Sequence, residues 1–213
     1  TAILTASSAL DTIPPSIVFN AGPEDQGLYT HQNSFPSSIL VADSGSGVAE
    51  SELILDDVSL GGVSTTLDLF ARPLGQHVLT VEAYDNAGNW NEQKRAFTVY
   101  ADATTTMADA NRAYALGWIK NKSTLSNLLA DLRAIIKIEK KIMKLEVKLP
   151  PAVEKKLTPE QRIRRRIEKL EAKIDKTLGK NFIGDLDKKL KSKAITVEAY
   201  TLLKDDALWL MNN

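Results

Sequence analysis

Residues 75–89, GQHVLTVEAYDNAGN, decide the fold of the first half of the chain. Two sets of side chains alternate in this stretch: Val78, Thr80, Glu82 and Tyr84, and between them Leu79, Val81, Ala83 and Asp85. This period of two predicts a β-strand with one buried face. The strand should end in the DNAGN segment, because Asx side chains and glycine favour turns. A second alternating run at residues 95–100 then predicts a β-hairpin.

Short runs with strand character also fill the chain before this hairpin. Turn residues separate them, and they lie at residues 17–19, 37–43, 52–55, 58–60 and 63–70. We expect Asp56 and Asp57 to form a hairpin turn. About seven short strands in ~90 residues are typical of an antiparallel β-sandwich. We therefore assign residues 12–101 to a β-domain, and residues 1–11 to a linker or an added strand.

The hydrophobic period changes after Ala101, which predicts an all-α second domain at residues 102–213. We expect a helix at 104–120, a long one at 123–149 capped by Ser123 or Thr124, and a third that starts at Thr158-Pro159. The apolar residues of the second recur every three or four positions: Leu125, Leu128, Leu132, Ile135, Ile138, Ile142 and Leu145. Those of the third are Ile163, Ile167, Leu170, Ile174 and Leu178.

These two apolar stripes predict a long antiparallel helical hairpin that turns at residues 150–157. Gly179 and Gly184 are expected to interrupt the third helix. A last helix should start at Thr196, with Ile195 and Tyr200 forming a hydrophobic staple. The predicted fold is thus multidomain, a β-sandwich followed by a four-helix bundle.

The β-domain resembles a known family in particular motifs. They are Pro14-Pro15, DSGSGV at residues 43–48, Leu55-Asp56-Asp57, and G-x-H-x-L-x-V-x-A-x-D-x-A-G-N from Gly75 followed by Phe97-x-Val99. These motifs resemble the bacterial immunoglobulin-like repeats of secreted and cell-surface proteins. The cysteine pair and core tryptophan of antibody domains are absent. The resemblance covers residues 12–101 and implies an Ig-like sandwich that spaces, displays or binds.

The helical half resembles the FIMAH module, a small helical domain of extracellular bacterial enzymes and surface proteins. The matching segments are GWI at 117–119, Asn121-Lys122, Phe182-Ile183, and AIT at 194–196 with the helix that follows it. Of the motif that names the family only Phe182-Ile183 is present, followed by Gly184, Asp185 and Leu186. The lysine- and arginine-rich hairpin is longer than the usual module.

Charge divides the chain at the same place as the hydrophobic pattern. The whole chain is neutral, but residues 1–101 hold 12 Asp and Glu against 3 Lys and Arg, a net charge of −9. Residues 102–213 hold 24 Lys and Arg against 15 Asp and Glu, a net charge of +9. Such opposed halves could attract each other between copies, so self-association is one interpretation.

The strongest functional signal is a basic run at residues 133–193, with 20 Lys and Arg against 9 Asp and Glu. It includes Arg162, Arg164, Arg165, Arg166, Lys169 and Lys173. A field of this sign attracts polyanions such as cell-wall polymers or acidic glycans. Phe182 is the only aromatic residue in the run, which argues against nucleic acid. A solvated hairpin with helical ion pairs is the alternative interpretation.

Two further features of the β-domain are candidate sites. The side chains of Asp43, Asp85, Asn86 and Asn89 offer oxygen ligands for calcium, although Asx turns explain each of them equally well. Trp90 lies at the tip of the hairpin among polar residues, where it could contact a glycan or the second domain. Apart from calcium, no cofactor is indicated.

Catalytic signals are missing from the sequence. Cysteine is absent, and neither His31 nor His77 has a second histidine at ligand spacing. No Gly-x-Ser-x-Gly or Ser-x-x-Lys motif lies at a strand-to-helix turn. We therefore expect that the chain is not an enzyme.

The resemblances place the chain in a secreted or cell-surface protein of bacterial type. No apolar run approaches the ~20 residues of a membrane helix, and Thr1 does not follow a leader, so we expect a piece of a longer protein. We interpret it as a spacer, adhesion or assembly module. The alternatives are an accessory domain that targets a secreted polysaccharide- or protein-degrading enzyme to its substrate, and a subunit of a salt-sensitive surface fibre.

Overall fold

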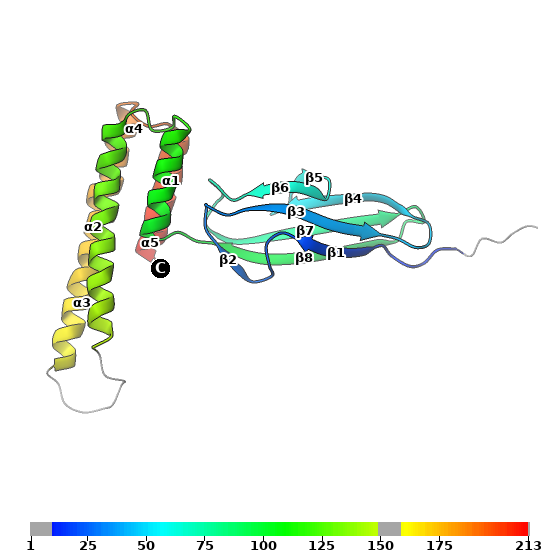
Figure 1. Ribbon diagram of the computed structural model, residues 1–213, viewed down its shortest axis with the longest axis horizontal. Coiled ribbons are helices and arrows are strands. Elements are labelled where there is room, and N and C mark those ends of the chain that lie inside the picture. The colour runs from blue at the N-terminus through cyan, green and yellow to red at the C-terminus, as the bar shows by residue number, and fades with distance from the viewer. Residues whose placement is uncertain (1–9, 149–158, 213) are drawn as a thin grey trace, which may run out of the picture. The chain divides into compact units, whose positions relative to one another are not determined.

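A computed structural model describes residues 10–148 and 159–212, and Figure 1 labels their strands and helices. The chain divides into two compact units. The first contains the chain up to Tyr29, Asn33–Leu69 and Gly75–Val99, and the second contains Thr30–Gln32, Phe70–Leu74 and the chain from Tyr100 onward. The second unit therefore takes in two short loop segments that lie between strands in the sequence.

The described part of the first unit contains eight strands in two sheets. The smaller sheet has the order β1-β3-β6, with β1 at Ser16–Ala21, β3 at Ser34–Ala42 and β6 at Ser64–Asp68. The larger has the order β2-β8-β7-β4-β5, with β2 at Gly27–Tyr29, β4 at Val48–Leu55, β5 at Val58–Gly61, β7 at Gly75–Asp85 and β8 at Trp90–Val99. All neighbours in both sheets are antiparallel except β2 and β8.

The predicted hairpin is confirmed as β7 and β8, which pair from Gly75 opposite Val99 to Tyr84 opposite Trp90. The predicted inner face of β7 is buried, because Leu79, Val81 and Ala83 are inaccessible to solvent. Strand β8 starts at Trp90, five residues before the predicted run. Its polar first half carries no apolar alternation, so only pairing with β7 reveals it.

The sequence predicts the turn between β4 and β5 but not the short strand β2. The Asp56-Asp57 turn is confirmed: both residues have positive φ, 49° and 63°, as a type I′ hairpin turn requires. Strand β2 is not predicted, because a three-residue Gly-Leu-Tyr segment is too short to show a period. It pairs in parallel with β8 through Gly27, Leu28 and Tyr29.

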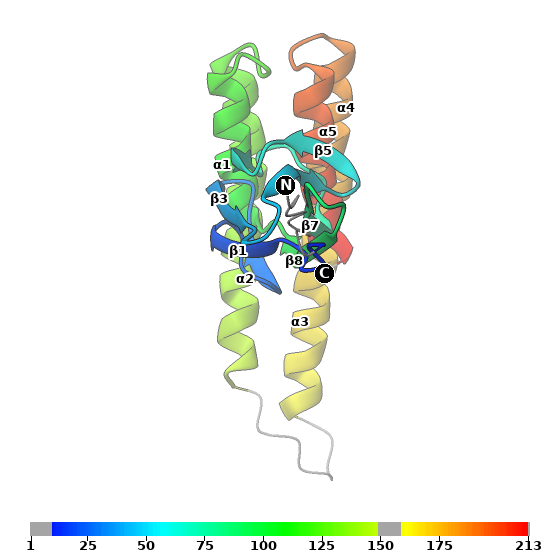
Figure 2. The same ribbon diagram turned by 90° about the vertical axis from the view of Figure 1, so that its right-hand side faces the viewer.

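The second unit is helical. Its elements are α1 at Ala103–Ala115, α2 at Lys122–Glu146, α3 at Pro159–Lys176, the π-helical segment η1 at Thr177–Ile183, α4 at Gly184–Lys191 and α5 at Val197–Asn212. Their shared core includes Ala110, Ala113, Leu128, Leu132, Ile135, Leu178, Phe182, Leu186, Ala199 and Leu203. Helices α2 and α3 run side by side in Figures 1 and 2 and extend beyond α1 and α5.

Two predicted helix boundaries are wrong. Helix α1 ends at Ala115 rather than at Lys120, because Gly117 adopts a positive φ of 75° that no helix residue takes. Helix α2 is capped by Asn121 and not by Ser123 or Thr124. The Asn121 carboxamide oxygen accepts hydrogen bonds from the Thr124 amide and from the Ser123 hydroxyl, both at 2.8 Å, so both candidate caps donate to the real one.

The helix around Gly179 and Gly184 does not break. Residues from Pro159 to Lys191 stay helical, and the irregularity that the glycines indicate is the π-helical segment η1. The staple residue Ile195 is buried, and the Thr196 hydroxyl accepts from the Ala199 amide at the start of α5. The predicted turn at 150–157, the Thr158 cap and most of the linker at 1–11 lie outside the described residues.

Two leucines of α5 provide a matched test of the helical core. Leu203 is inaccessible and belongs to the shared core, whereas Leu208 is 39% exposed on the same helix. We expect Leu203→Ala to lower the free energy of unfolding by about 2–5 kcal/mol, because it removes buried methyl groups and leaves a cavity. Leu208→Ala should cost less than about 1 kcal/mol.

Urea denaturation followed by the helical circular-dichroism signal measures both variants. Equal losses would contradict this assignment of the core.

Candidate functional site

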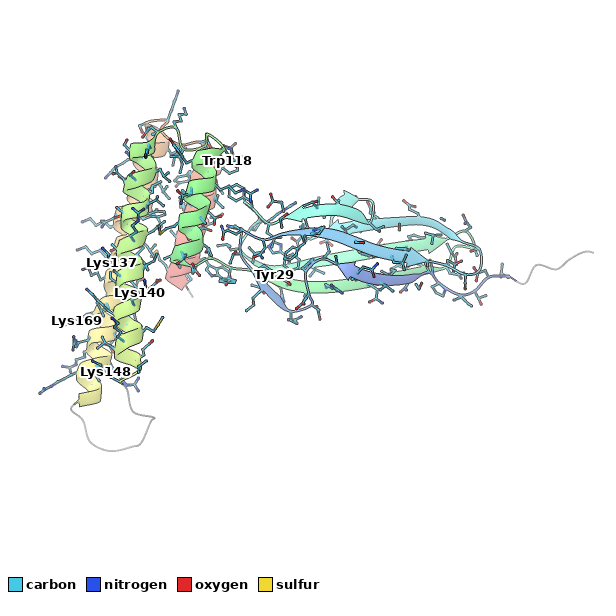
Figure 3. The ribbon with its side chains drawn as sticks, in the orientation of Figure 1. Tyr29, Trp118, Lys137, Lys140, Lys148 and Lys169 are labelled. Atoms are coloured by element: carbon cyan, nitrogen blue, oxygen red, sulfur yellow. The ribbon has the colours of Figure 1, made fainter. Side chains whose placement is uncertain are left out.

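Two cationic stripes run along the α2–α3 hairpin. On α2 and just past its end they are Lys137, Lys141, Lys144 and Lys148, and on α3 they are Arg162, Arg166, Lys169 and Lys173. Both sets follow the same spacing of four, three and four residues, which keeps them on one side of a helix. Figure 3 labels Lys137, Lys148 and Lys169 along the two helices.

A cleft of about 490 Å³ lies between the stripes. Its lining comes from both helices: Lys141, Lys144, Leu145 and Lys148 from the first, and Arg166, Lys169 and Leu170 from the second. Leu145 is buried and Leu170 is half-buried, so the cleft combines cationic walls with apolar surface. No acidic side chain in residues 10–148 or 159–212 forms an ion pair with these five cations.

The structure brings together only part of the predicted cationic set. Arg166 and Lys169 line the cleft, while Arg162 and Lys173 share their side of α3 by helical spacing. All six predicted cations are exposed, and Arg164 lies on the opposite side of the helix. The lysines of α2 were missed as site residues, although their matching four, three, four spacing could have identified them.

The predicted calcium residues lie at one end of the first unit. There, Asp43, Asp85 and Asp11 each place a carboxylate oxygen within 4.8 Å of the others. Asp11 was not among the predicted ligands. The predicted ligand Asn86 instead donates through its amide nitrogen to the carbonyl oxygens of Ser46 and Gly47, at 2.9 and 3.0 Å.

Backbone amide groups use most of these carboxylate oxygens. Asp43 Oδ2 accepts from the amides of Gly45 and Gly47, and Asp85 Oδ1 accepts from the amides of Ala87 and Asn89. The predicted ligand Asn89 donates from its side chain to Asp85 Oδ2 at 2.7 Å. Turn formation thus accounts for the observed contacts of these residues, and calcium binding stays a prediction.

These hydrogen bonds favour the ionised form of Asp85. Burial raises the pKa of Asp85, but the hydrogen bonds from the Asn89 side chain and from the Asn89 and Ala87 amides outweigh burial. The pKa of Asp85 is therefore below its ordinary value. Hydrogen bonds from the Ile13 and Ser46 amides likewise lower the pKa of Asp11.

Trp90 is the third of the sites that the sequence predicts. It begins β8 directly opposite Tyr84 of β7, and both rings are close to half exposed. Directly opposite residues of an antiparallel pair point to the same face of the sheet. Trp90 therefore belongs to an exposed aromatic pair, and a glycan contact there stays a prediction.

A third cluster was missed by the sequence. In the second unit, His31 meets Asp109 of α1 and Asp206 of α5, and all three are at most 1% exposed. Burial raises the pKa of Asp206 well above its ordinary value, and the nearby charge of Asp109 raises it further. The sequence does contain one sign of this cluster. Asp109 in α1 and Asp206 in α5 each precede a buried alanine, Ala110 and Ala207, and lie on the buried side of their helix.

Comparison with known proteins gives only distant likenesses. Neither a protein-family model nor a curated protein matches the sequence. Similar solved structures are fibronectin(III)-like modules of Clostridium thermocellum CbhA, at 14% identity over 41% of this chain and 47% of that chain, with a TM-score of 0.34. The SrpA adhesin of Streptococcus sanguinis is 19% identical over 50% and 75% of the two chains, with a TM-score of 0.31.

The R347E mutant of the SrpA adhesin is 18% identical over 44% of this chain and 61% of that chain, with a TM-score of 0.31. This chain therefore spans less than half of the CbhA structure and about three fifths of the mutant adhesin. At such scores the likenesses transfer no site. Among the described helices, none combines the length and apolar character needed to cross a membrane.

Asp85 should make the first unit sensitive to acid. Because its pKa is lower in the folded chain, its stabilising contribution is present above the unfolded value of about 3.9 and is lost as the pH falls through the folded pKa. We expect Asp85→Asn to flatten the dependence of Tm on pH between about 5 and about 2. It should also lower Tm at neutral pH, because an amide nitrogen then faces the Asn89 donor.

Thermal unfolding followed by the β-sheet circular-dichroism signal measures this effect. Glu82→Gln is the matched control, since it removes a carboxylate from the same strand without touching the turn. An Asp85→Asn protein with the acid sensitivity of the unmodified chain would refute the assignment.

Proposed function

We propose that this chain is a non-catalytic module of a secreted or cell-surface protein whose α2–α3 cleft binds an acidic polysaccharide or wall polymer. In this proposal the first unit is an Ig-like β-sandwich that spaces or displays. The second unit is a four-helix bundle of FIMAH-like type that carries the binding cleft. The adhesion role thus resides in the helical hairpin.

The observation that supports this proposal is the pair of matched cationic stripes around an open cleft. From Lys137 to Lys148 the stripe spans about 16 Å at the helical rise of ~1.5 Å per residue. The charges are therefore spread along a line, as an extended anionic chain requires, rather than focused on one small anion. Lys and Arg can keep their charged ends in water while their aliphatic stems pack beside Leu145 and Leu170.

The lining of the cleft favours an acidic polymer over nucleic acid and over catalysis. Proteins that bind single strands stack bases on aromatic side chains, and none of the cleft residues is aromatic. Phe182, the one aromatic residue of the basic run, is fully buried in the helical core. None of the described residues that line the cleft carries a carboxylate or an imidazole for acid–base chemistry.

Neutralising the cleft should weaken polymer binding. We expect the triple variant Lys144→Gln, Arg166→Gln, Lys169→Gln to bind heparin, a soluble acidic glycan, at least tenfold more weakly at low salt. Each exposed ion pair contributes about 0.2–1 kcal/mol, so the loss of three pairs of about 0.6 kcal/mol each costs about 1.8 kcal/mol, and 1.4 kcal/mol corresponds to a tenfold change. Surface plasmon resonance on immobilised heparin, repeated at rising salt, measures the change.

The control is a triple variant with the same charge loss outside the cleft, Lys120→Gln, Arg164→Gln, Lys191→Gln. Equal weakening in both variants would show that net charge and not the cleft binds the polymer, and would refute the proposal. Tighter binding to a short DNA duplex than to heparin would assign the cleft to nucleic acid instead. Light scattering without polymer separates self-association of the −9 and +9 halves, which high salt should abolish.

A second candidate function is substrate targeting for a secreted polysaccharide-degrading enzyme, and the exposed Trp90–Tyr84 pair favours it. Aromatic faces stack on sugar rings, so this pair offers a platform for a neutral glycan. We expect Trp90→Ala to abolish retention on insoluble neutral polysaccharides in a pull-down. Tyr114→Ala removes an exposed ring from α1 and should leave retention unchanged. An unmodified chain that is not retained would exclude this function.

A further inference from the structure

The buried cluster of His31, Asp109 and Asp206 shares no residue with the cationic cleft or with the aromatic pair. His31 belongs to the segment Thr30–Gln32, which is part of the second unit, and the two aspartates come from α1 and α5. None of the three side chains has access to bulk water. Charged groups persist in such a place only when other groups compensate them.

The contact of His31 with the backbone fixes which ring nitrogen carries a proton. His31 Nε2 lies 2.9 Å from the carbonyl oxygen of Arg72, and a carbonyl oxygen can only accept a hydrogen bond. Nε2 is therefore protonated and donates. In a neutral imidazole the other nitrogen, Nδ1, then presents a lone pair.

His31 Nδ1 faces two acidic side chains. His31 Nδ1 lies 3.0 Å from Asp109 Oδ2 and 3.5 Å from Asp206 Oδ1. The three atoms converge on one point, which a proton on Nδ1 or on a carboxyl group must occupy when no metal ion is bound. A divalent cation balances the charge of two carboxylates and a neutral imidazole.

The surroundings of the Asp206 carboxylate indicate a ligand most directly. Neither of its carboxylate oxygens has a hydrogen-bond partner among the described residues, although the side chain is completely buried. The nearby Thr106 hydroxyl donates to the Asp102 carbonyl oxygen at 2.9 Å, so its proton is engaged elsewhere. Nearly all buried polar groups in proteins are paired, so both oxygens are available for a bond that the protein chain does not supply.

From these contacts we propose that His31 Nδ1 and the carboxylates of Asp109 and Asp206 bind one divalent first-row transition-metal ion. The mixed nitrogen and oxygen donors suit Zn²⁺ or Mn²⁺ better than Ca²⁺ or Mg²⁺, which prefer oxygen alone. Ligands about 2.1 Å from such an ion lie ~3.0 Å apart at right angles and ~3.4 Å apart at the tetrahedral angle. The observed separations of 3.0 and 3.5 Å match these values.

The groups behind the ligands match the usual surroundings of a metal site. Metal-binding histidines commonly donate their second N–H to a carbonyl or a carboxylate, as His31 does to Arg72. Asp109 Oδ1 accepts a 2.7 Å hydrogen bond from the Gln32 amide, which orients Oδ2 toward the centre. Gln32 is thus a positioning residue for Asp109.

A cleft next to the cluster offers the ion a path from solvent. It has a volume of about 340 Å³ and is lined by His31, Arg72, Glu198, Thr201 and Asp205, among others. The exposed carboxylates of Glu198 and Asp205 give its wall acidic groups on an otherwise basic unit. Such groups attract a cation to the opening.

Metal titration of the full chain tests this site. After removal of metal by a chelator, we expect calorimetry to show one equivalent of Zn²⁺ or Mn²⁺ bound, and Tm to rise with metal concentration. Ca²⁺ and Mg²⁺ should bind at least tenfold more weakly. An X-ray absorption spectrum of the Zn²⁺ form should show nitrogen and oxygen neighbours only.

Isosteric variants identify the ligands. Asp206→Asn, Asp109→Asn and His31→Gln should each weaken Zn²⁺ binding more than tenfold, and Gln32→Leu should weaken it about tenfold as a loss of support. His77→Gln is the control, because His77 forms a similar 2.6 Å pair with Asp56 but belongs to neither cluster of three potential ligands found among the described residues. It should keep the affinity of the unmodified chain.

The metal-free proteins separate ligand loss from misfolding. Metal-free Asp206→Asn should be at least as stable as the metal-free unmodified chain, because the variant relieves repulsion between two buried carboxylates. The proposal fails if no cation raises the Tm of the stripped unmodified chain, or if Asp206→Asn binds Zn²⁺ normally. Heparin binding does not depend on this cluster, so the two proposals can fail separately.

Discussion

An antiparallel pair of helices can bury only a narrow stripe of each helix, and this constraint shapes the charged surface of the second unit. Beyond the core that the helices share, α2 and α3 bury Ile138, Leu145 and Ile167. Each such side chain contributes about 1.5–3 kcal/mol when fully buried. The positions beside the stripe remain exposed, and lysine and arginine occupy them on both helices.

This placement links the stability of the hairpin to its proposed ligand. Like charges on facing stripes repel each other, so the cations that keep the seam soluble also oppose the packing of the two helices. An anionic polymer in the cleft would remove that repulsion while the apolar contacts persist. A cleft of this kind gains stability from its ligand, because binding favours the folded hairpin over its open forms.

The sequence predicted those elements in which a buried face repeats with a regular period. Strand β7 and the apolar stripe of α2 were found in this way, whereas β2 is defined by pairing with the distant strand β8, and the first half of β8 by pairing with β7. The segment η1 shows a subtler limit. Leu178, Phe182 and Leu186 follow each other at four-residue intervals, longer than an α-helical turn, and all three are inaccessible. A π-helical segment has wider turns and keeps them on one face, so the glycines indicated an irregularity but not its form.

The candidate sites also differ in how far a local sequence pattern reveals them. The α3 side of the cationic cleft was predicted because arginines cluster at residues 162–166, but the lysines of α2 were not singled out, although their spacing matches that of the α3 stripe. The aspartates at one end of the first unit were predicted, but not the contribution of Asp11. His31 and Asp109 are 78 positions apart in the sequence, so no local spacing could join them. An acidic residue within an alanine-rich buried face was the one visible sign.

The packing of α1 and α5 explains why the buried carboxylates come so close together. The inward faces of these helices are rich in alanine, with Ala110 and Ala113 on one and Ala199 and Ala207 on the other. Small side chains let two helices approach closely, since the interaxial distance depends on the residues at the contact. Asp109 and Asp206 lie within these same faces, so the contact that closes the core also drives two negative charges together. The proposed cation would offset this repulsion, because His31 Nδ1 and one oxygen of each carboxylate surround the place that it would occupy.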